Sequence, residues 1–300
     1  MLFLLYTPLY LCVIINNEII GEYIFMIDNI KLIVCDVDGT LVAFGQTLSD
    51  KAKDVIKRLQ AHGIQFGIAS GRPLYEIREL EAKWEIDFKN DILIGMNGAQ
   101  LWDGNNNTTE EYFKLKTEWM KEIIESMEQF DLNPCIYYGN KMMCKKEDEF
   151  VLKSIERNYK ETIYPDDISE MYKEENPKIM FRGKAEETLK AEEYVKQHPS
   201  PNYHAFRTGP IIIEFADRRT SKAYALQKFC EHNNIPLECV MTFGDTSNDN
   251  DMLAISGIGV CLCNGTEDTK AIADMITEKP AEEDGFVHFI EEHILKPRGW

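Results

Sequence analysis

Two groups of carboxylates follow apolar segments of the chain at spacings suited to metal and phosphate chemistry. Asp36 and Asp38 lie in DVDGT, directly after LIVC, and Asp245 and Asp249 lie in GDTSND, directly after VMTF. Carboxylates this close to the end of a buried strand repel one another unless a cation lies between them. Mg²⁺ is the expected cation, because it prefers oxygen ligands and binds through one or two carboxylates together with substrate phosphate. We therefore predict a Mg²⁺ site that includes Asp36 and Asp38, and note that Asp245 and Asp249 could likewise serve a metal or a phosphate.

Further polar residues are suited to hold a phosphate group. The hydroxyl of Ser70, in ASGRP, and the backbone N–H groups beside it would bind phosphate oxygens as helix N-termini do. Lys222 begins a predicted helix, where the dipole disfavours a cation, and a bound phosphate would remove that conflict. The simpler interpretations are a helix cap for Ser70, a surface position for Lys222 and a tight turn for Asn97-Gly98. The predicted substrate-binding residues are Ser70, Gly71, Arg72, Asn97, Lys222 and Asn248.

Short apolar strands and amphipathic helices alternate around these residues. KLIVCD, IQFGIAS and DILIGMNG read as strands, and SDKAKDVIKRLQAHG between the first two reads as a helix capped by Ser49. After residue 211 the alternation resumes with strands in CVMTFGD and IGVCL and a helix over EDTKAIADMI. The alternation predicts an α/β fold with a doubly wound parallel sheet. The candidate residues follow its strands, at the edge where such sheets bind ligands.

Residues 101–210 have a different rhythm of helices and strands, which predicts an inserted α+β cap domain between core segments 26–100 and 211–300. Residues 1–25 are mostly apolar, but Pro8, Asn16 and Asn17 interrupt them. The apolar stretch within this segment has no basic residue before it. They are a poor signal peptide or membrane span. Our hypothesis is that translation starts at Met26 and that the upstream segment is a gene-start artefact, with an N-terminal anchor as the alternative.

The four motifs together resemble those of the haloacid dehalogenase superfamily of phosphatases, and the large cap resembles its Cof-type branch with a type IIB cap. The resemblance implies that Asp36 attacks phosphorus to form an aspartyl-phosphate, and that Asp38 protonates the leaving alcohol and then activates water. Ser70 and Lys222 would hold the phosphoryl group. Asp245 would bind the metal directly, and Asp249 would act through water or by holding the residues that bind the metal. The chain departs from the common GVSKG around the lysine, where it has RTSKA.

Composition excludes other classes of protein. The chain has 51 acidic and 33 basic residues, and its net charge of −18 repels nucleic acid and anionic membranes. We expect neither as a partner, and no protein partner is implied. The eight cysteines show no Cys-x-x-Cys spacing, which favours reduced thiols in a cytoplasmic protein.

The predicted function is Mg²⁺-dependent hydrolysis of a small phosphorylated metabolite, such as a sugar phosphate, a nucleotide or a phosphorylated cofactor. A phosphomutase would use the same core and differs only in the acceptor of the phosphoryl group. A non-catalytic phosphate-binding or signalling module is disfavoured, because such a module would lack Asp36 or Asp38 and both are present.

Overall fold

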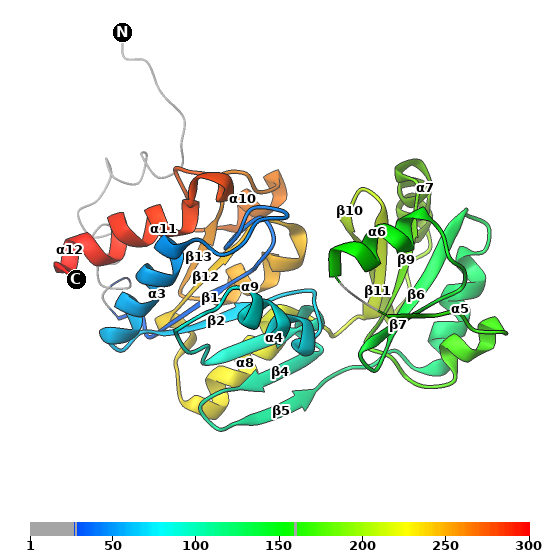
Figure 1. Cartoon of the computed structure of the whole chain (residues 1–300), viewed down its shortest axis with the longest axis horizontal. Helices are drawn as coiled ribbons and strands as arrows, with labels where there is room; N and C mark the ends of the chain where they lie inside the picture. The colour runs from blue at the N-terminus through cyan, green and yellow to red at the C-terminus, as the bar shows by residue number, and fades with distance from the viewer. Residues whose placement is uncertain (1–26, 28, 159–160) are drawn as a thin grey trace, which may run out of the picture. The chain divides into compact units, whose positions relative to one another are not determined.

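The computed structural model describes residues 27, 29–158 and 161–300, and the chain divides into two compact units (Figure 1). The first, here called the core, comprises the described residues up to Glu110 together with Ser221–Trp300. The second, here called the cap, is Glu111–Thr220. The boundaries therefore fall at 111 and 221 rather than at the predicted 101 and 211. Residues 1–25 and the proposed start at Met26 lie outside the described residues.

The core is built on an eight-stranded sheet. Its strands, in spatial order, are β14 (Met275–Ile276), β13 (Ile258–Cys261), β12 (Val240–Gly244), β1 (Leu32–Cys35), β2 (Gln65–Ala69), β3 (Ile92–Gly95), β4 (Gln100–Asp103) and β5 (Thr108–Glu111). The six strands from β14 to β3 are parallel, and β4 is antiparallel to β3. All four residues of β1 are buried, as expected of a central strand covered on both faces.

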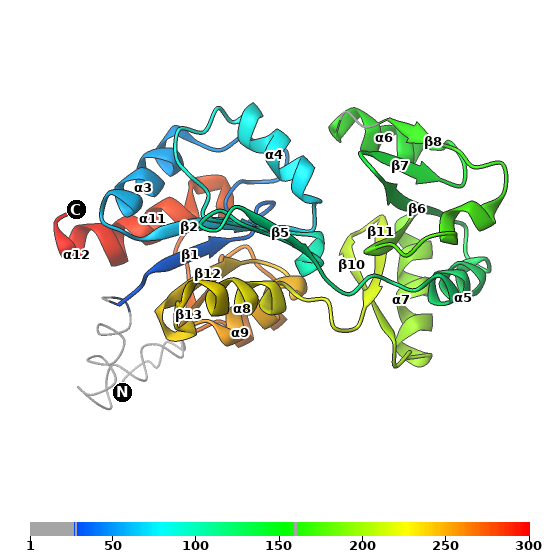
Figure 2. The same cartoon turned by 90° about the horizontal axis from the view of Figure 1, so that it is seen from below.

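Helices cover both faces of this sheet. They are α3 (Asp50–Ala61), α4 (Leu74–Lys83), α8 (Lys222–Asn233), α9 (Asn250–Ile255), α10 (Glu267–Ile272), α11 (Gly285–Ile290) and α12 (Lys296–Arg298). Figure 2 shows α3 and α11 on one side of the sheet and α8 and α9 on the other. The predicted doubly wound α/β fold is confirmed. No helix within the described part of the chain is long and apolar enough to span a membrane.

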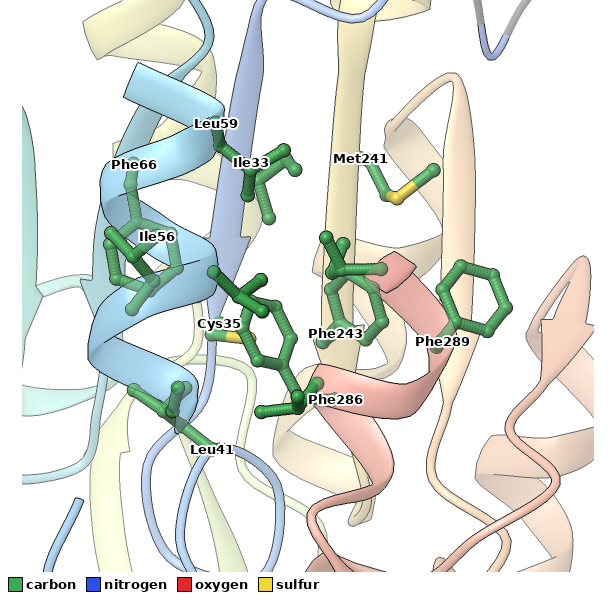
Figure 3. Close-up of a cluster of buried hydrophobic side chains, with 14 of the residues drawn as sticks. Ile33, Cys35, Leu41, Ile56, Leu59, Phe66, Met241, Phe243, Phe286 and Phe289 are labelled. Atoms are coloured by element: carbon green, nitrogen blue, oxygen red, sulfur yellow. The ribbon is translucent and has the colours of Figure 1, made fainter. Parts of the chain in front are cut away.

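Local sequence explains how α3 forms and packs. Ser49 caps it, because its hydroxyl oxygen accepts a hydrogen bond from the backbone N–H of Ala52 at 3.1 Å. The apolar residues of α3 lie on one buried face and meet the aromatic residues of the sheet and α11 (Figure 3). Phe243 contacts Phe286 and Phe289 nearly edge-to-face, at centroid distances of 5.0 and 5.4 Å. This packing fixes the strands whose ends carry the candidate site.

The cap contains a six-stranded sheet of its own. In spatial order its strands are β10 (Tyr203–Gly209), β11 (Ile212–Asp217), β9 (Lys178–Gly183), β6 (Leu132–Tyr138), β7 (Lys141–Cys144) and β8 (Thr162–Ile163). Its helices are α5 (Thr117–Met127), α6 (Glu149–Asn158) and α7 (Ala185–Gln197). The apolar residues of α5 and α7 pack in one cluster with β9 and β11. A turn at Gly139-Asn140 joins β6 to β7.

Two predictions of local structure were wrong. The polar segment DGNNNTTEE was taken as the start of the cap, but it contains the turn and second strand of the β4–β5 hairpin, which extends the core sheet. The helix predicted over EDTKAIADMI ends at Ile272, and Met275–Ile276 instead form the edge strand β14. A strand of two residues leaves too short a pattern to be distinguished from the end of a helix.

Candidate active site

Four adjacent strands of the core end in polar residues at one edge of the sheet. Asp36 follows β1, Ser70 follows β2, Asn97 comes two residues after β3, and Asp245 follows β12. These strands run parallel in the order β12, β1, β2, β3, so their carboxyl ends meet. All four residues are at least nine-tenths buried. The edge therefore gathers buried polar residues at the ends of four largely apolar strands.

Three buried carboxylates form a compact cluster at this edge. One oxygen from each of Asp36, Asp245 and Asp249 lies within 4.8 Å of the others. Burial raises the pKa of Asp36 well above its ordinary value. Burial and the neighbouring Asp249 raise the pKa of Asp245 to about 7. Three acids and one lysine leave excess negative charge, so the donor set suits a hard divalent cation.

The lysine of this site, Lys222, is the first residue of α8 and is fully buried. Its Nζ lies 2.5 Å from Asp36 Oδ1 and 2.6 Å from Asp249 Oδ1. Burial lowers the pKa of Lys222, but the charges of Asp249 and Asp36 outweigh it and raise the pKa above its ordinary value. These two carboxylates offset the unfavourable position of a cation at a helix N-terminus.

The position of Asp249 limits what it can do. Its Oδ2 accepts the backbone N–H groups of Asp245 at 3.0 Å and of Thr246 at 3.2 Å, while its Oδ1 accepts from Lys222. Both oxygens are therefore engaged within the protein. This arrangement suits a residue that orients Asp245 and Lys222 better than one that contributes a free ligand.

The loop after β1 is held against Asp245. Thr40 Oγ1 donates a hydrogen bond of 2.9 Å to Asp245 Oδ1. Gly39 has a φ of +93°, and a Cβ added there would lie 2.5 Å from Asp245 Oδ2. Only glycine satisfies both the backbone conformation and this close approach.

Asp38 is not one of the three clustered acids, and its carboxylate pairs with Arg72. The Arg72 Nε donates to Asp38 Oδ2 at 3.0 Å, and its Nη2 lies 2.9 and 3.1 Å from the two carboxylate oxygens. About a quarter of the Asp38 side chain is exposed, 26%. The structure thus separates the Asp38 side chain from the group of acids that could bind a metal ion.

Ser70, Gly71, Asn97 and Asn248 form a second polar group beside the acids. Ser70 Oγ accepts the backbone N–H of Arg72 at 3.2 Å, and Asn97 Oδ1 accepts from Asn248 Nδ2 at 3.1 Å. Asn97 Nδ2 is buried and has no hydrogen-bond partner among the described residues. Such a donor has capacity to spare for a ligand oxygen. A Cβ at Gly71 would lie 3.2 Å from Asn97 Oδ1, so this approach leaves little room for a larger residue.

Asn264 is a positioning residue that sequence reasoning missed. Its Nδ2 donates to the Gly39 carbonyl at 2.8 Å, and its Oδ1 accepts the backbone N–H of Ala281 at 2.9 Å. It ties the loop that carries Asp36 and Asp38 to the turn after β13. The only signal in the sequence is an Asn-Gly turn after a strand, which is too common to mark a functional residue.

Comparison with known proteins identifies the family. Residues 33–290 match the haloacid dehalogenase-like hydrolase family. Two 5-amino-6-(5-phospho-D-ribitylamino)uracil phosphatases of Bacillus subtilis are similar to the chain. YitU is 26% identical over 88% of this chain and 97% of its own length, and YcsE is 28% identical over 89% and 97%. A crystal structure of a haloacid dehalogenase-like hydrolase from Bacteroides thetaiotaomicron aligns with a TM-score of 0.76 and 26% identity, and covers 88% of this chain and 99% of that one.

The chain belongs to the haloacid dehalogenase-like hydrolase family, as the family match over most of its length shows. The predicted Cof-type assignment and the predicted class of enzyme, a phosphoric monoester hydrolase, are confirmed. Enzymes of this family generally use a divalent metal ion, and the buried acids at the sheet edge are the cluster that could hold one.

Proposed function

We propose that this protein is a Mg²⁺-dependent phosphatase that hydrolyses a small phosphorylated metabolite through an aspartyl-phosphate on Asp36. The observation that carries the proposal is the contact of Lys222 with both Asp36 and Asp249 inside a buried acidic cluster. Full burial of a lysine at a helix N-terminus is unfavourable by itself, so its position in this site supports a role in binding the phosphoryl group. The arrangement supplies a nucleophile, a cation site and a fixed positive charge in one place.

The metal would be held by the carboxylates of Asp36 and Asp245 and the backbone carbonyl of Asp38. Asp249 would act from behind Asp245 or through water. When bound, Mg²⁺ would reduce the repulsion between the attacking carboxylate and the phosphate, which is the main electrostatic obstacle to the reaction.

The protein's own residues divide the remaining work. Asp36 attacks phosphorus, and the P–O bond to the leaving alcohol breaks while Asp38 gives that oxygen a proton. Asp38 then takes a proton from water, which attacks the aspartyl-phosphate and releases inorganic phosphate. Lys222, the Ser70 hydroxyl and the spare Asn97 amide donor hold the phosphoryl oxygens. Arg72 keeps Asp38 oriented through both steps.

The substrate class follows from the chemistry of the site together with the relatives. Two relatives act on a phosphorylated ribityl compound, which is a small alcohol phosphate. We propose a substrate of this general kind, a sugar or polyol phosphate, a nucleotide or a phosphorylated cofactor, in the cytoplasm.

The test is hydrolysis of p-nitrophenyl phosphate and a panel of phosphorylated metabolites, including the ribitylaminouracil phosphate, with and without Mg²⁺. Wild type is compared with Asp36→Asn, which keeps the shape of the side chain but removes the nucleophile. We expect Mg²⁺-dependent phosphate release that the variant loses. Conversion of a sugar phosphate to its isomer without stoichiometric phosphate release would instead identify a phosphomutase. A folded protein that binds Mg²⁺ but turns over nothing would refute the proposal.

A further inference from the structure

Three sulfur-bearing side chains form a row across adjacent strands of the cap. In the register of the sheet, Cys135 of β6 lies opposite Cys144 of β7 on one side and opposite Met180 of β9 on the other. Figure 1 labels these three strands in the cap. All three residues are at most 1% exposed and belong to one buried cluster with Met142 and Val151. The row is separate from the acidic cluster of the core.

The two thiols are placed to act together. The backbone N–H of Lys145 donates to the Pro134 carbonyl at 3.1 Å, so the adjacent pair, Cys135 and Cys144, is the kind without ladder hydrogen bonds. In such pairs the Cα atoms are about 4.5 Å apart and the side chains approach most closely. The Cys135 thiol and burial raise the pKa of the Cys144 thiol, as expected of two thiols in contact. Both cysteines are free.

A buried arginine beside the row has no acidic partner among the residues that the structure describes. Arg182 lies two residues after Met180 on β9, hence on the same face, and its Nη2 is 3.9 Å from Met180 Sδ. It is only 8% exposed, and its Nε is buried and lacks a hydrogen-bond partner. Within the described residues, no carboxylate forms an ion pair with it. A buried charge without a counter-charge is strongly unfavourable, so Arg182 calls for an anion beyond those that the described residues supply.

Asp148, whose charge reaches Cys144, does not meet this need. Its oxygens accept the side-chain amide of Asn133 and the backbone N–H groups of Phe150 and Val151. It therefore serves as the cap of α6 rather than as the partner of Arg182. Among the described residues, the two thiols are the further groups beside the arginine that would become negative, once a metal ion displaces their protons.

We propose that Cys135, Cys144 and Met180 form a binding site for a soft monovalent metal cation, Cu(I) in a cell, with Arg182 as the counter-charge. Two thiolates and one monovalent ion carry a net charge of −1, which Arg182 neutralises. Thiolate and thioether ligands favour Cu(I) over a hard ion such as Mg²⁺. Binding displaces the two thiol protons to solvent and changes no oxidation state. The bound ion joins β6, β7 and β9, so it stabilises the cap.

The test is an anaerobic competition for Cu(I) between the full-length protein and the chelator bicinchoninate, run to equilibrium because the site is buried. Wild type is compared with Cys135→Ala/Cys144→Ala and with the matched control Cys230→Ala/Cys239→Ala, which removes two buried thiols from the core. We expect wild type and control to retain one Cu(I) per chain and the cap variant to lose it. Met180→Leu and Arg182→Gln should each weaken retention by about 10- to 100-fold.

Two results would overturn the proposal. Wild type that gives up all Cu(I) to bicinchoninate while remaining folded by circular dichroism has no such site. Equal losses in both double variants would show general thiol binding instead. If the cysteine variant does not fold, Met180→Leu decides in its place. This substitution conserves volume and adds no polar group, so the protein should fold while the cation loses one sulfur ligand. A thermal shift with Ag(I) in wild type that Met180→Leu reduces would support the site independently of copper redox chemistry.

Discussion

Arg72 and Asp38 form a two-pronged ion pair in which three N···O distances lie between 2.9 and 3.1 Å. The guanidinium plane matches the two carboxylate oxygens, so it fixes both the position and the rotation of the acid. The Arg72 Nη1 also lies 3.8 Å from the Oε2 of Glu76 in the first turn of α4. The proposed general acid is thus held by a residue that follows Ser70 in the same motif.

Arg72→Ala should therefore reduce turnover more for substrates whose leaving group needs a proton than for those whose leaving group does not. An alkyl alcohol needs a proton as it leaves, whereas p-nitrophenolate does not. General acid–base catalysis contributes roughly 100- to 10,000-fold, and we expect the variant to lose at least about tenfold on an alkyl phosphate. It should lose much less on p-nitrophenyl phosphate, and kcat measured on both substrates checks this.

The control for this prediction is Arg78→Ala in α4, the helix that begins two residues after Arg72. Arg78 pairs with Glu81 at 2.9 Å and lies over the Trp102 ring, away from Asp38. The Arg78→Ala variant should leave the ratio of kcat on the alkyl phosphate to kcat on p-nitrophenyl phosphate unchanged. Equal losses on both substrates in Arg72→Ala would indicate that Arg72 binds the phosphate and does not position the acid.

Lys222→Met should destabilise the core as well as inactivate it. The substitution leaves Asp36 and Asp249 buried without their shared positive charge, and breaking a buried ion pair in this way costs about 3–5 kcal/mol. The free energy of unfolding in urea without metal measures the loss. Added Mg²⁺ should restore part of it, because a cation in the acidic cluster replaces some of the missing charge.

Lys228→Met is the matched control, because Lys228 lies on the same helix and pairs with Glu231 at the surface. Its stability should equal that of wild type within error. A Lys222 variant as stable as this control would contradict the central role given to the lysine.

Much of the core site could be predicted from the sequence because it depends on local order. A strand followed at once by an acid puts that acid at the carboxyl edge of a parallel sheet, and this holds for Asp36 and Asp245. The place of Lys222 at the start of a helix was equally visible, since Ser221 is a typical cap.

The partners of these residues could not be predicted, because they depend on tertiary contacts. Arg72 was assigned to substrate, and nothing in the local pattern indicated that its side chain reaches Asp38, 34 residues away. Asn264 holds Gly39 across 225 residues. The β4–β5 hairpin was missed for a different reason, since its polar strand TTEE has no apolar alternation to reveal it.

Gly39→Ala should abolish Mg²⁺-dependent activity, whereas Gly45→Ala should not. Both glycines have positive φ, +93° and +78°, so alanine costs about 1–2 kcal/mol at either position. Only at Gly39 does the new Cβ meet another group, 2.5 Å from Asp245 Oδ2; at Gly45 nothing lies within 4 Å. Activity titrated with Mg²⁺ separates the two effects. Comparable activities would show that the loop moves freely away from Asp245.

Mg²⁺ should stabilise the protein more at about pH 7.5 than at about pH 5.5. These two test values lie on either side of the pKa of Asp245, which is raised from an ordinary 3.8 to about 7. The pKa of Asp36 is raised as well. In the metal-free protein these acids bind protons more tightly when folded than when unfolded. Their contribution to the free energy of unfolding therefore falls as the pH rises through this range.

A bound cation removes that penalty, and protons compete with it at the lower pH. The melting temperature with and without Mg²⁺ at the two pH values gives the comparison. Asp245→Asn should shrink the Mg²⁺-dependent shift at both, because it removes a titrating group and a ligand together. A larger shift at the lower pH in wild type would mean that Mg²⁺ binds elsewhere, since a cluster of acids with raised pKa values must release protons before it holds a cation.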